Sequence, residues 1–224
     1  MKIVSTGREF YERTYHYEED ITIPDTKRIA RFFKDIKFRK DHRFLDIGCG
    51  AGTALQYCAQ RSLQCFGFDI SARAIRLARA STNALTLVAN GEILPYRTAF
   101  FDVVSSFGSI EHFSRVEQGL KESSRVTKRG GQVLLVVPNS YWIINKLQLY
   151  KGTEQPLEKL ATVGQWARLF KQQGLIVQMV RKDFGPRILK NRYLLGIIKR
   201  TLLKATIALP TSFAYQFIFV CRRQ

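Results

Sequence analysis

Residues 44–53 read Phe44-Leu45-Asp46-Ile47-Gly48-Cys49-Gly50-Ala51-Gly52-Thr53, and they carry the strongest structural signal in the chain. Its first four residues are typical of a short buried strand, and the glycines at 48, 50 and 52 then make a tight turn. A helix is predicted from Thr53 to about Arg61. Because glycine has no Cβ, the backbone of such a turn can approach a ligand closely. The dinucleotide fingerprint G-x-G-x-x-G would need glycine where Thr53 stands, so the pattern is a different one.

The rest of the chain alternates short apolar runs with helical stretches, which favours a mostly parallel sheet. Further strands are expected at 65–69, 85–89, 101–105, 132–137, 175–180 and 213–220. Helices are expected from about 25, over 72–80, near 115–127, over 162–173 and within 187–209. Ser71 is the expected N-cap of the helix at 72–80, and Gly130-Gly131 is expected to stop the helix near 115–127.

Polar residues follow the predicted strands at the points where those strands end. Asp69 closes the second strand, where a carboxylate can accept hydrogen bonds from both ribose hydroxyls of a nucleoside. Asn90-Gly91-Glu92 follow the third strand, where a polar side chain can contact an adenine edge. The turn after the fourth strand offers backbone to another part of the same ligand. Since open α/β sheets bind ligands at the carboxyl ends of their strands, these residues predict one site.

Taken in order, these motifs resemble those of class I S-adenosylmethionine-dependent methyltransferases. The likeness is closest to the small-molecule, quinone-biosynthesis-like branch called type 11, and it covers about residues 40–140. The segments that carry it are Asp46–Gly52, Asp69, Glu92–Tyr96, Phe101–Val104, Glu111-His112, Arg125-Val126, Gly130-Gly131 and Val137–Asn139.

The resemblance implies an α/β fold, a Rossmann-like three-layer sandwich. Its seven-stranded, mostly parallel sheet would have the order 3-2-1-4-5-7-6, with strand 7 antiparallel. The whole chain, 1–224, would then be one methyltransferase domain. Within it, we expect an N-terminal helical lid at 1–43, a cofactor-binding core at 44–140, and a substrate-side variable region with the last two strands at 141–224.

The resemblance also implies roles for individual residues toward S-adenosyl-L-methionine, whose product is S-adenosyl-L-homocysteine. Asp46 would orient the glycine turn and the methionine amino group, and Asp69 would hold the ribose. The implied cofactor-binding set is Asp46, Gly48, Cys49, Gly50, Asp69, Ile70, Asn90, Gly91, Glu92, Ser106 and Phe107.

The chain departs from the family pattern at two positions. Asn90 stands where the family usually has Asp, although an amide oxygen can still accept from the adenine amino group. Some quinone O-methyltransferases of this type carry a Glu three residues before the Glu-His pair and are thought to bind a divalent ion there. This chain has Gly108 at that position, so we expect no metal.

The chemistry of the reaction leaves one candidate for a catalytic side chain. A sulfonium methyl is already activated, so the enzyme mainly aligns the acceptor with it and excludes water. A base is needed only for an acceptor that is protonated at neutral pH. His112 is the best candidate, and a structural or substrate-orienting role for it is equally open. His16 and its tyrosine neighbours form either a lid over the cofactor or a packed aromatic cluster. Cys49 is expected to be a small buried residue and no nucleophile.

Composition adds a question about partners. The chain has 36 Lys+Arg against 18 Asp+Glu, a formal charge of +18, which suggests nucleic acid or an anionic membrane surface. Residues 184–224 hold eight Lys/Arg and no acid between apolar residues, which suits peripheral membrane contact. The start has no apolar leader, and the four cysteines include no C-x-x-C pair. We therefore expect a reduced cytoplasmic protein, in one version peripheral on the inner face of the membrane.

The favoured hypothesis is thus methyl transfer to a small acceptor that is apolar or lipid-linked. One alternative is an RNA methyltransferase acting on tRNA or rRNA. Against it, the turn after the fourth strand reads Ser106-Phe107-Gly108-Ser109 and not the Asn/Asp-Pro-Pro-Tyr/Phe box of amino-methylating enzymes. The other alternative is a non-catalytic protein that retains the fold.

Overall fold

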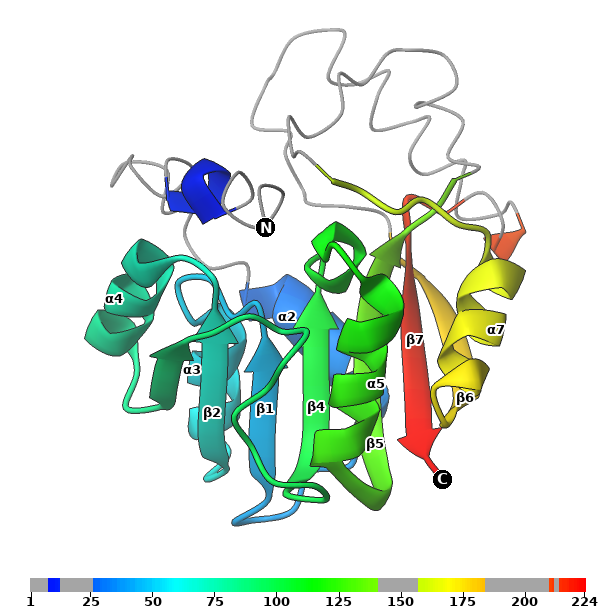
Figure 1. The fold of residues 1–224 in the computed structure, drawn as a ribbon. Coiled ribbons are helices and arrows are strands. Elements are labelled where there is room, and N and C mark those ends of the chain that lie inside the picture. The colour runs from blue at the N-terminus through cyan, green and yellow to red at the C-terminus, as the bar shows by residue number, and fades with distance from the viewer. Residues whose placement is uncertain (1–7, 13–25, 141–156, 184–209, 212–213) are drawn as a thin grey trace, which may run out of the picture.

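The computed structural model describes residues 8–12, 26–140, 157–183, 210–211 and 214–224. Their strands form one seven-stranded sheet of order β3-β2-β1-β4-β5-β7-β6 (Figure 1). The strands are β1 Arg43–Ile47, β2 Gln64–Asp69, β3 Leu85–Val88, β4 Phe101–Phe107, β5 Thr127–Pro138, β6 Leu175–Asp183 and β7 Gln216–Arg223. Pairs among the first five strands are parallel, whereas β7 runs antiparallel to both β5 and β6. The predicted fold class and strand order are confirmed.

Helices cover both faces of this sheet. The helices are α2 Thr26–Phe32, η2 Phe33–Asp35, α3 Thr53–Ala59, α4 Ala72–Ser81, η3 Ile110–His112, α5 Val116–Val126 and α7 Val163–Gln172. A further short helix spans residues 8–12. Helices α5 and α7 lie in front of the sheet in Figure 1, and α2 and α3 lie behind it. This three-layer arrangement leaves the carboxyl ends of β1, β2 and β4 at one edge, where the glycine turn and η3 also lie.

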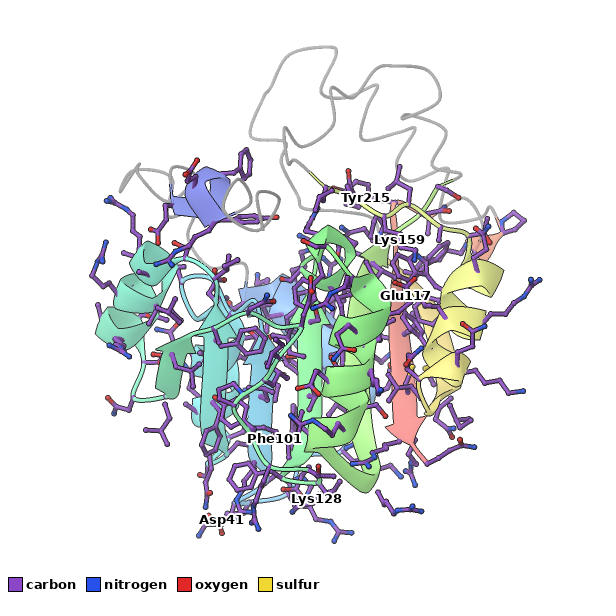
Figure 2. All side chains as sticks on the ribbon, viewed as in Figure 1. Asp41, Phe101, Glu117, Lys128, Lys159 and Tyr215 are labelled. Carbon is purple, nitrogen blue, oxygen red and sulfur yellow. The ribbon has the colours of Figure 1, made fainter. Side chains whose placement is uncertain are left out.

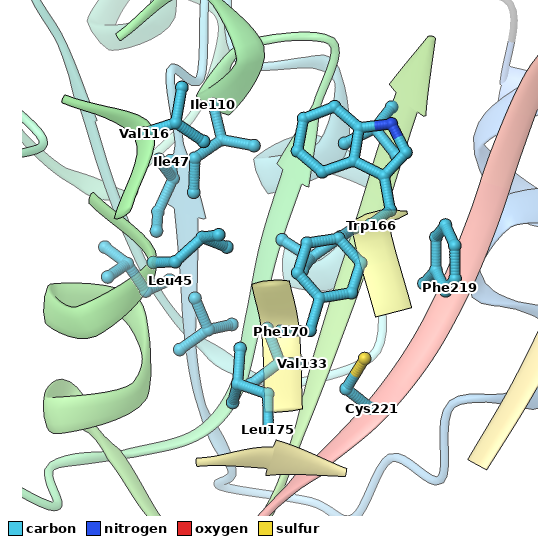
Figure 3. Close-up of a cluster of buried hydrophobic side chains, with 14 of the residues drawn as sticks. Leu45, Ile47, Ile110, Val116, Val133, Trp166, Phe170, Leu175, Phe219 and Cys221 are labelled. Atoms are coloured by element: carbon cyan, nitrogen blue, oxygen red, sulfur yellow. The ribbon is translucent and has the colours of Figure 1, made fainter. Parts of the chain in front are cut away.

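Two apolar clusters hold the layers together, one on each side of the sheet. In front, Trp166 and Phe170 of α7 stack with ring centroids 5.7 Å apart, and Phe219 of β7 packs edge-on against Phe170 (Figure 3). The buried Trp166 indole N–H donates to the Pro138 carbonyl at 3.0 Å, so burial leaves its polar atom satisfied. Behind, Phe33 packs against Phe44 of β1. The strands are apolar on both faces because both faces are covered.

Local signals set most of the helix boundaries. Ser71 caps α4 as predicted, since its hydroxyl accepts from the Ala74 N–H at 3.1 Å. Thr162 and Gln165 form a reciprocal capping box at the start of α7. Gly174, with φ of 76°, follows the end of that helix as expected.

The predicted helix stop at Gly130-Gly131 is wrong. Helix α5 ends at Val126, and β5 begins at Thr127, several residues before the predicted start at 132. Thr127 pairs with Phe101 of β4, and its hydroxyl donates to the Ser123 carbonyl at 2.6 Å. Gly130 does have a positive φ of 71°, but it lies inside β5, where the register with β4 shifts between Phe101 and Val103.

The edge strand β3 is covered in part by a side chain from α4. Leu85 and Val88 are 66% and 44% exposed at this edge. The Arg79 guanidinium donates to the Thr86 carbonyl at 2.8 Å and to the Thr86 hydroxyl at 3.3 Å. This occupies a backbone acceptor in a strand that has a neighbour on one side only.

Several expectations fall on residues outside the described ranges. These are the helix within 187–209, the aromatic segment around His16, and most of the basic region 184–224. Within the described part of that region, Arg223 donates to the backbone carbonyls of Arg125 and Thr127. Among the described residues, no helix has the length and apolar character needed to cross a lipid bilayer.

Candidate active site

The glycine turn between β1 and α3 needs its first glycine for two reasons. Gly48 has a φ of 68°, a conformation that L side chains rarely adopt. A Cβ at this position would lie 2.4 Å from the Ser109 hydroxyl oxygen, which itself donates to the Gly48 carbonyl at 3.3 Å. The turn is thus held against the loop that follows β4, and it leaves backbone open at the strand ends.

Asp69 connects the end of β2 to this turn. One carboxylate oxygen accepts from the Gly50 N–H at 3.0 Å and the other accepts from the Ser71 N–H at 2.9 Å. Burial raises the pKa of Asp69, and these backbone hydrogen bonds oppose the rise. The predicted ribose-binding carboxylate is therefore fixed in place, with its oxygens at the strand ends.

Asp46 lies next to it, fully buried in β1. Its Oδ1 accepts from the Ser105 hydroxyl of β4 at 2.7 Å. Burial raises its pKa from 3.8 to about 7, a shift that the Ser105 hydrogen bond opposes and nearby Asp69 reinforces. No Lys or Arg in the described ranges forms an ion pair with Asp46 or Asp69. Two buried acids side by side suit a ligand that brings positive charge.

The loop after β3 divides its polar groups between the predicted site and the fold. The Asn90 amide oxygen accepts from the Glu92 N–H at 2.9 Å, which closes the turn. Glu92 turns toward α5, where its carboxylate accepts from the Arg115 side chain at 2.8 Å and from the Arg115 N–H at 3.0 Å. A Cβ on Gly91 would lie 2.3 Å from the Phe113 ring, so this glycine admits an aromatic side chain that the sequence analysis did not single out.

The remaining predicted contacts lie around the same strand ends. Ser106 is fully buried in β4, and its hydroxyl has no hydrogen-bond partner among the described residues. The Phe107 ring points away toward α2, where it stacks on Phe32 at 5.3 Å. Ile70 is half-buried directly after Asp69. Cys49 is buried beside Gly67, and burial raises the pKa of its thiol, as expected for an unreactive cysteine.

His112 lies in η3, just beyond β4, with its side chain 8% exposed. Its Nδ1 contacts the Leu157 carbonyl, which can only accept, so Nδ1 carries a proton and donates it. Burial lowers the pKa of His112 and the Leu157 contact opposes that shift. At neutral pH the ring is therefore neutral, with the lone pair on Nε2. This is the state that a general base requires.

The short helix at 8–12 contributes two residues that the sequence analysis missed. The Glu12 carboxylate accepts from the first backbone N–H groups of α4, at 2.7 Å from Ala72 and 3.3 Å from Arg73, and from the Ser71 hydroxyl at 3.2 Å. The Tyr11 ring lies edge-on to His112 with centroids 6.5 Å apart. This helix therefore spans from α4 to η3, across the carboxyl ends of the strands. No local pattern in the sequence signals these long-range contacts.

The described ranges hold no group of three or more His, Cys, Asp or Glu side chains arranged to bind a metal ion. The expectation of a metal-free site stays a prediction.

The central part of the chain matches a known protein family. Residues 45–135 match the family described as "Methyltransferase domain", type 11. This segment is a methyltransferase domain of that family. The predicted family resemblance is confirmed at this level, while the quinone-biosynthesis branch stays untested.

Curated relatives match parts of the chain. An uncharacterized protein of Methanocaldococcus jannaschii is 32% identical over 61% of this chain and 61% of its own length. The protein named "Probable tRNA methyltransferase 9B" of Bos taurus is 32% identical over 58% of this chain, which is 28% of that protein. Ajmaline N-methyltransferase of Rauvolfia serpentina is 30% identical over 46% of this chain and 38% of its own length. The chain thus matches about a quarter to three-fifths of these relatives' lengths.

A solved structure extends the likeness to almost the whole fold. A methyltransferase solved in complex with the Haloferax volcanii Trm112 methyltransferase activator has a TM-score of 0.75. Each chain covers 96% of the other, at 16% sequence identity. At that identity the comparison supports the fold alone.

The residues present fit S-adenosylmethionine, the cofactor that the family match implies. The glycine turn leaves the backbone open where a Cβ at Gly48 would clash. Asp46 is a buried carboxyl that forms no ion pair with a Lys or Arg of the described ranges. Ser106 offers a buried hydroxyl that has no hydrogen-bond partner among the described residues. We expect Asp46 to face the cationic methionine end and Asp69 the ribose.

Proposed function

We propose that this chain methylates a small acceptor that is apolar or lipid-linked. The observation that carries the proposal is the pair of rings at the strand ends. Tyr11 faces His112, and His112 holds its imine nitrogen free of the Leu157 contact. An apolar molecule could lie against the tyrosine ring while Nε2 receives a proton from its reacting group.

Bound S-adenosylmethionine supplies a methyl carbon attached to a sulfonium, which is a good leaving group. The chain's own contribution is then to hold the cofactor and the acceptor in line and to exclude water. Asp69 and the glycine turn fix one end of the site, and the 8–12 helix covers it from above through Glu12. Because the pKa of His112 is lowered, its ring is neutral at neutral pH and can accept a proton from the acceptor.

The test is a label-transfer assay with matched histidine variants. Purified protein and methyl-labelled S-adenosylmethionine are incubated with an organic-solvent extract of cells. We expect label in a small molecule, with His112→Gln lowering kcat by about 100-fold and leaving the cofactor KM unchanged. His42→Gln, near the opposite end of the sheet, should behave as wild type. Equal rates for both variants would rule out a base at His112, and absence of any product would favour the non-catalytic alternative.

A second candidate acceptor is RNA. The relatives named as tRNA methyltransferases and the formal charge of +18 favour it. The neighbour solved with the Trm112 activator adds a candidate partner for that activity. Filter binding of tRNA and label transfer to total RNA, each with and without a Trm112-type activator, separate the two acceptors. Label in RNA and none in small molecules would replace the first proposal with the second.

A further inference from the structure

Glu111 is the buried acidic group that the roles above leave unused. It lies in η3 between the end of β4 and His112, and only 2% of its surface is exposed. Its Oε2 has no hydrogen-bond partner among the described residues, and its Oε1 lies 3.8 Å from Nε2 of His112. Burial raises its pKa to about 8. A carboxyl in this state costs folding free energy unless a ligand completes it.

The Glu111 carboxyl lies beside the two rings at the strand ends, since its Oε1 is 3.8 Å from Nε2 of His112 and the His112 ring lies edge-on to Tyr11. Burial raises the pKa of Tyr11, and the negative charges of Glu111, Asp69 and Glu158 add to that rise. Glu111 thus borders the strand-end site through its neighbour His112, whose ring lies edge-on to Tyr11.

The described cations nearby are engaged elsewhere. Lys159 pairs at 2.5 Å with Glu117, an exposed residue of α5, and both residues are labelled in Figure 2. Arg115 pairs with Glu92. His112 is neutral, since burial lowers its pKa. Although the whole chain carries +18, the described wall of this site is acidic.

We propose that the acceptor presents an amine nitrogen to Glu111, so that this chain is an N-methyltransferase of small amines. The inference rests on the proposed methyl transfer and names its substrate class. A protonated amine offers N–H donors to the unpartnered Oε2, and its positive charge favours the carboxylate form of Glu111, which burial alone disfavours. A carboxylate or phosphate acceptor would instead add negative charge beside Glu111 and Glu158, and a neutral alcohol would bring no positive charge to favour the carboxylate form of Glu111.

The proton balance of this reaction uses the two neighbouring side chains. A primary ammonium must lose one proton before its nitrogen lone pair is available. Glu111 holds the ammonium by hydrogen bonds, and Nε2 of His112 takes that proton. The lone pair then forms the C–N bond, while the electron pair of the broken C–S bond stays on sulfur. The product leaves as a methylammonium, and His112 returns its proton to solvent.

The first test measures binding in the presence of S-adenosylhomocysteine by calorimetry. The probes are benzylamine, benzyl alcohol and benzoate, which share one ring and differ in the group offered to Glu111. We expect wild type to bind benzylamine about tenfold more tightly than benzyl alcohol and to bind benzoate least. Glu111→Gln should reduce the amine preference to about twofold, and Glu117→Gln, which removes an exposed acid, should keep it.

Equal or tighter binding of the alcohol or benzoate by wild type overturns the proposal, as does an amine preference that survives in Glu111→Gln. Absence of benzylamine binding also counts against it. The wild-type comparison needs no variant, so it stands even where Glu111→Gln fails to fold. If wild type does not bind S-adenosylhomocysteine at all, the proposed function itself is refuted.

The second test identifies the product by mass spectrometry. A pooled mixture of amines, phenols, carboxylic acids and tRNA is offered with methyl-labelled cofactor. We expect N-methylated amines from wild type and at least about tenfold less from Glu111→Gln. Products methylated only on oxygen, or only in RNA, would overturn the amine assignment.

Discussion

The two ends of the sheet treat their acidic residues in opposite ways. At the amino end of β4, Asp102 accepts from Lys128 at 2.6 Å and from the Arg43 N–H at 3.0 Å. Burial alone would raise its pKa, but these partners outweigh burial and lower it. At the carboxyl end, burial raises the pKa of both Asp46 and Glu111. The acid at the amino end is paired within the fold, and we expect the acids at the carboxyl end to be paired by a ligand.

The largest expected effect is on cofactor affinity. Asp69→Ala removes a carboxylate with fixed oxygens, so we expect S-adenosylhomocysteine to bind about 100-fold more weakly or worse. The matched variant Asp102→Ala, at the other end of the sheet, should bind as wild type. Calorimetry on both variants makes the measurement, and equal affinities would erase the distinction between the two ends.

The next largest effect is expected at Asp46, where a substitution should raise stability but weaken cofactor binding. The folded-state pKa of Asp46 is raised from 3.8 to about 7, so its charged form destabilises the folded protein as pH rises through that window. Asp46→Asn should therefore raise the free energy of unfolding by about 2–4 kcal/mol near pH 8. Near pH 4 it should gain almost nothing, since Asp46 is then protonated in the folded state.

Urea unfolding of this variant at the two pH values makes that measurement, alongside calorimetry with S-adenosylhomocysteine. Cofactor binding should fall even as stability rises. A variant that is less stable at both pH values would contradict the assignment of Asp46 as a buried acid held for a ligand.

A pair of glycine substitutions sharpens the same contrast. Gly48→Ala places a Cβ against Ser109 in a positive-φ turn, and we expect a loss of about 1–3 kcal/mol together with weaker cofactor binding. Gly164→Ala, in α7, meets no atom within 4 Å. It should stabilise the protein by about 0.4–1 kcal/mol and leave binding unchanged. Thermal unfolding of both variants is the readout, and a loss of the same size in each would show that the turn has no special constraint.

The smallest effect belongs to the amino end. Lys128→Met should lower stability by less than about 1 kcal/mol near pH 7, because this pair is partly exposed. The pKa of Asp102 is lowered, so its contribution is present above the ordinary range of an aspartate and is lost as pH falls through it. The difference between wild type and variant should shrink steadily as the pH falls below the ordinary range of an aspartate, and it should vanish once Asp102 is protonated in the folded state. A difference that persists there would assign the loss to packing and not to charge.

The sequence predicted the first half of the fold closely because its signals are local. Strand, turn and cap residues around Gly48 and Ser71 stand next to the elements that they define. The start of β5 was missed since it depends on Thr127 pairing with Phe101, while nearby glycines suggested a stop. Strand β6 likewise continues beyond the predicted end at 180 to Asp183, because β7 pairs with it along that length.

The candidate site divides in the same way. Asp46 and Asp69 could be found from motifs, since each stands near the carboxyl end of a strand that the sequence predicts. Glu12 could not, because it reaches α4 across some sixty residues of chain. For Glu111 the Glu-His motif marked the position, but its burial and its unpartnered oxygen emerge only from packing.

The Arg79 side chain at the margin of β3 has a consequence for handling the protein. Its guanidinium saturates the Thr86 carbonyl beside the exposed Leu85, so a second chain cannot extend the sheet there without displacing it. Arg79→Ser would expose the apolar edge of β3 to intermolecular β-pairing. At high concentration this variant should aggregate sooner than wild type. Light scattering would detect that aggregation before any change in methyl transfer.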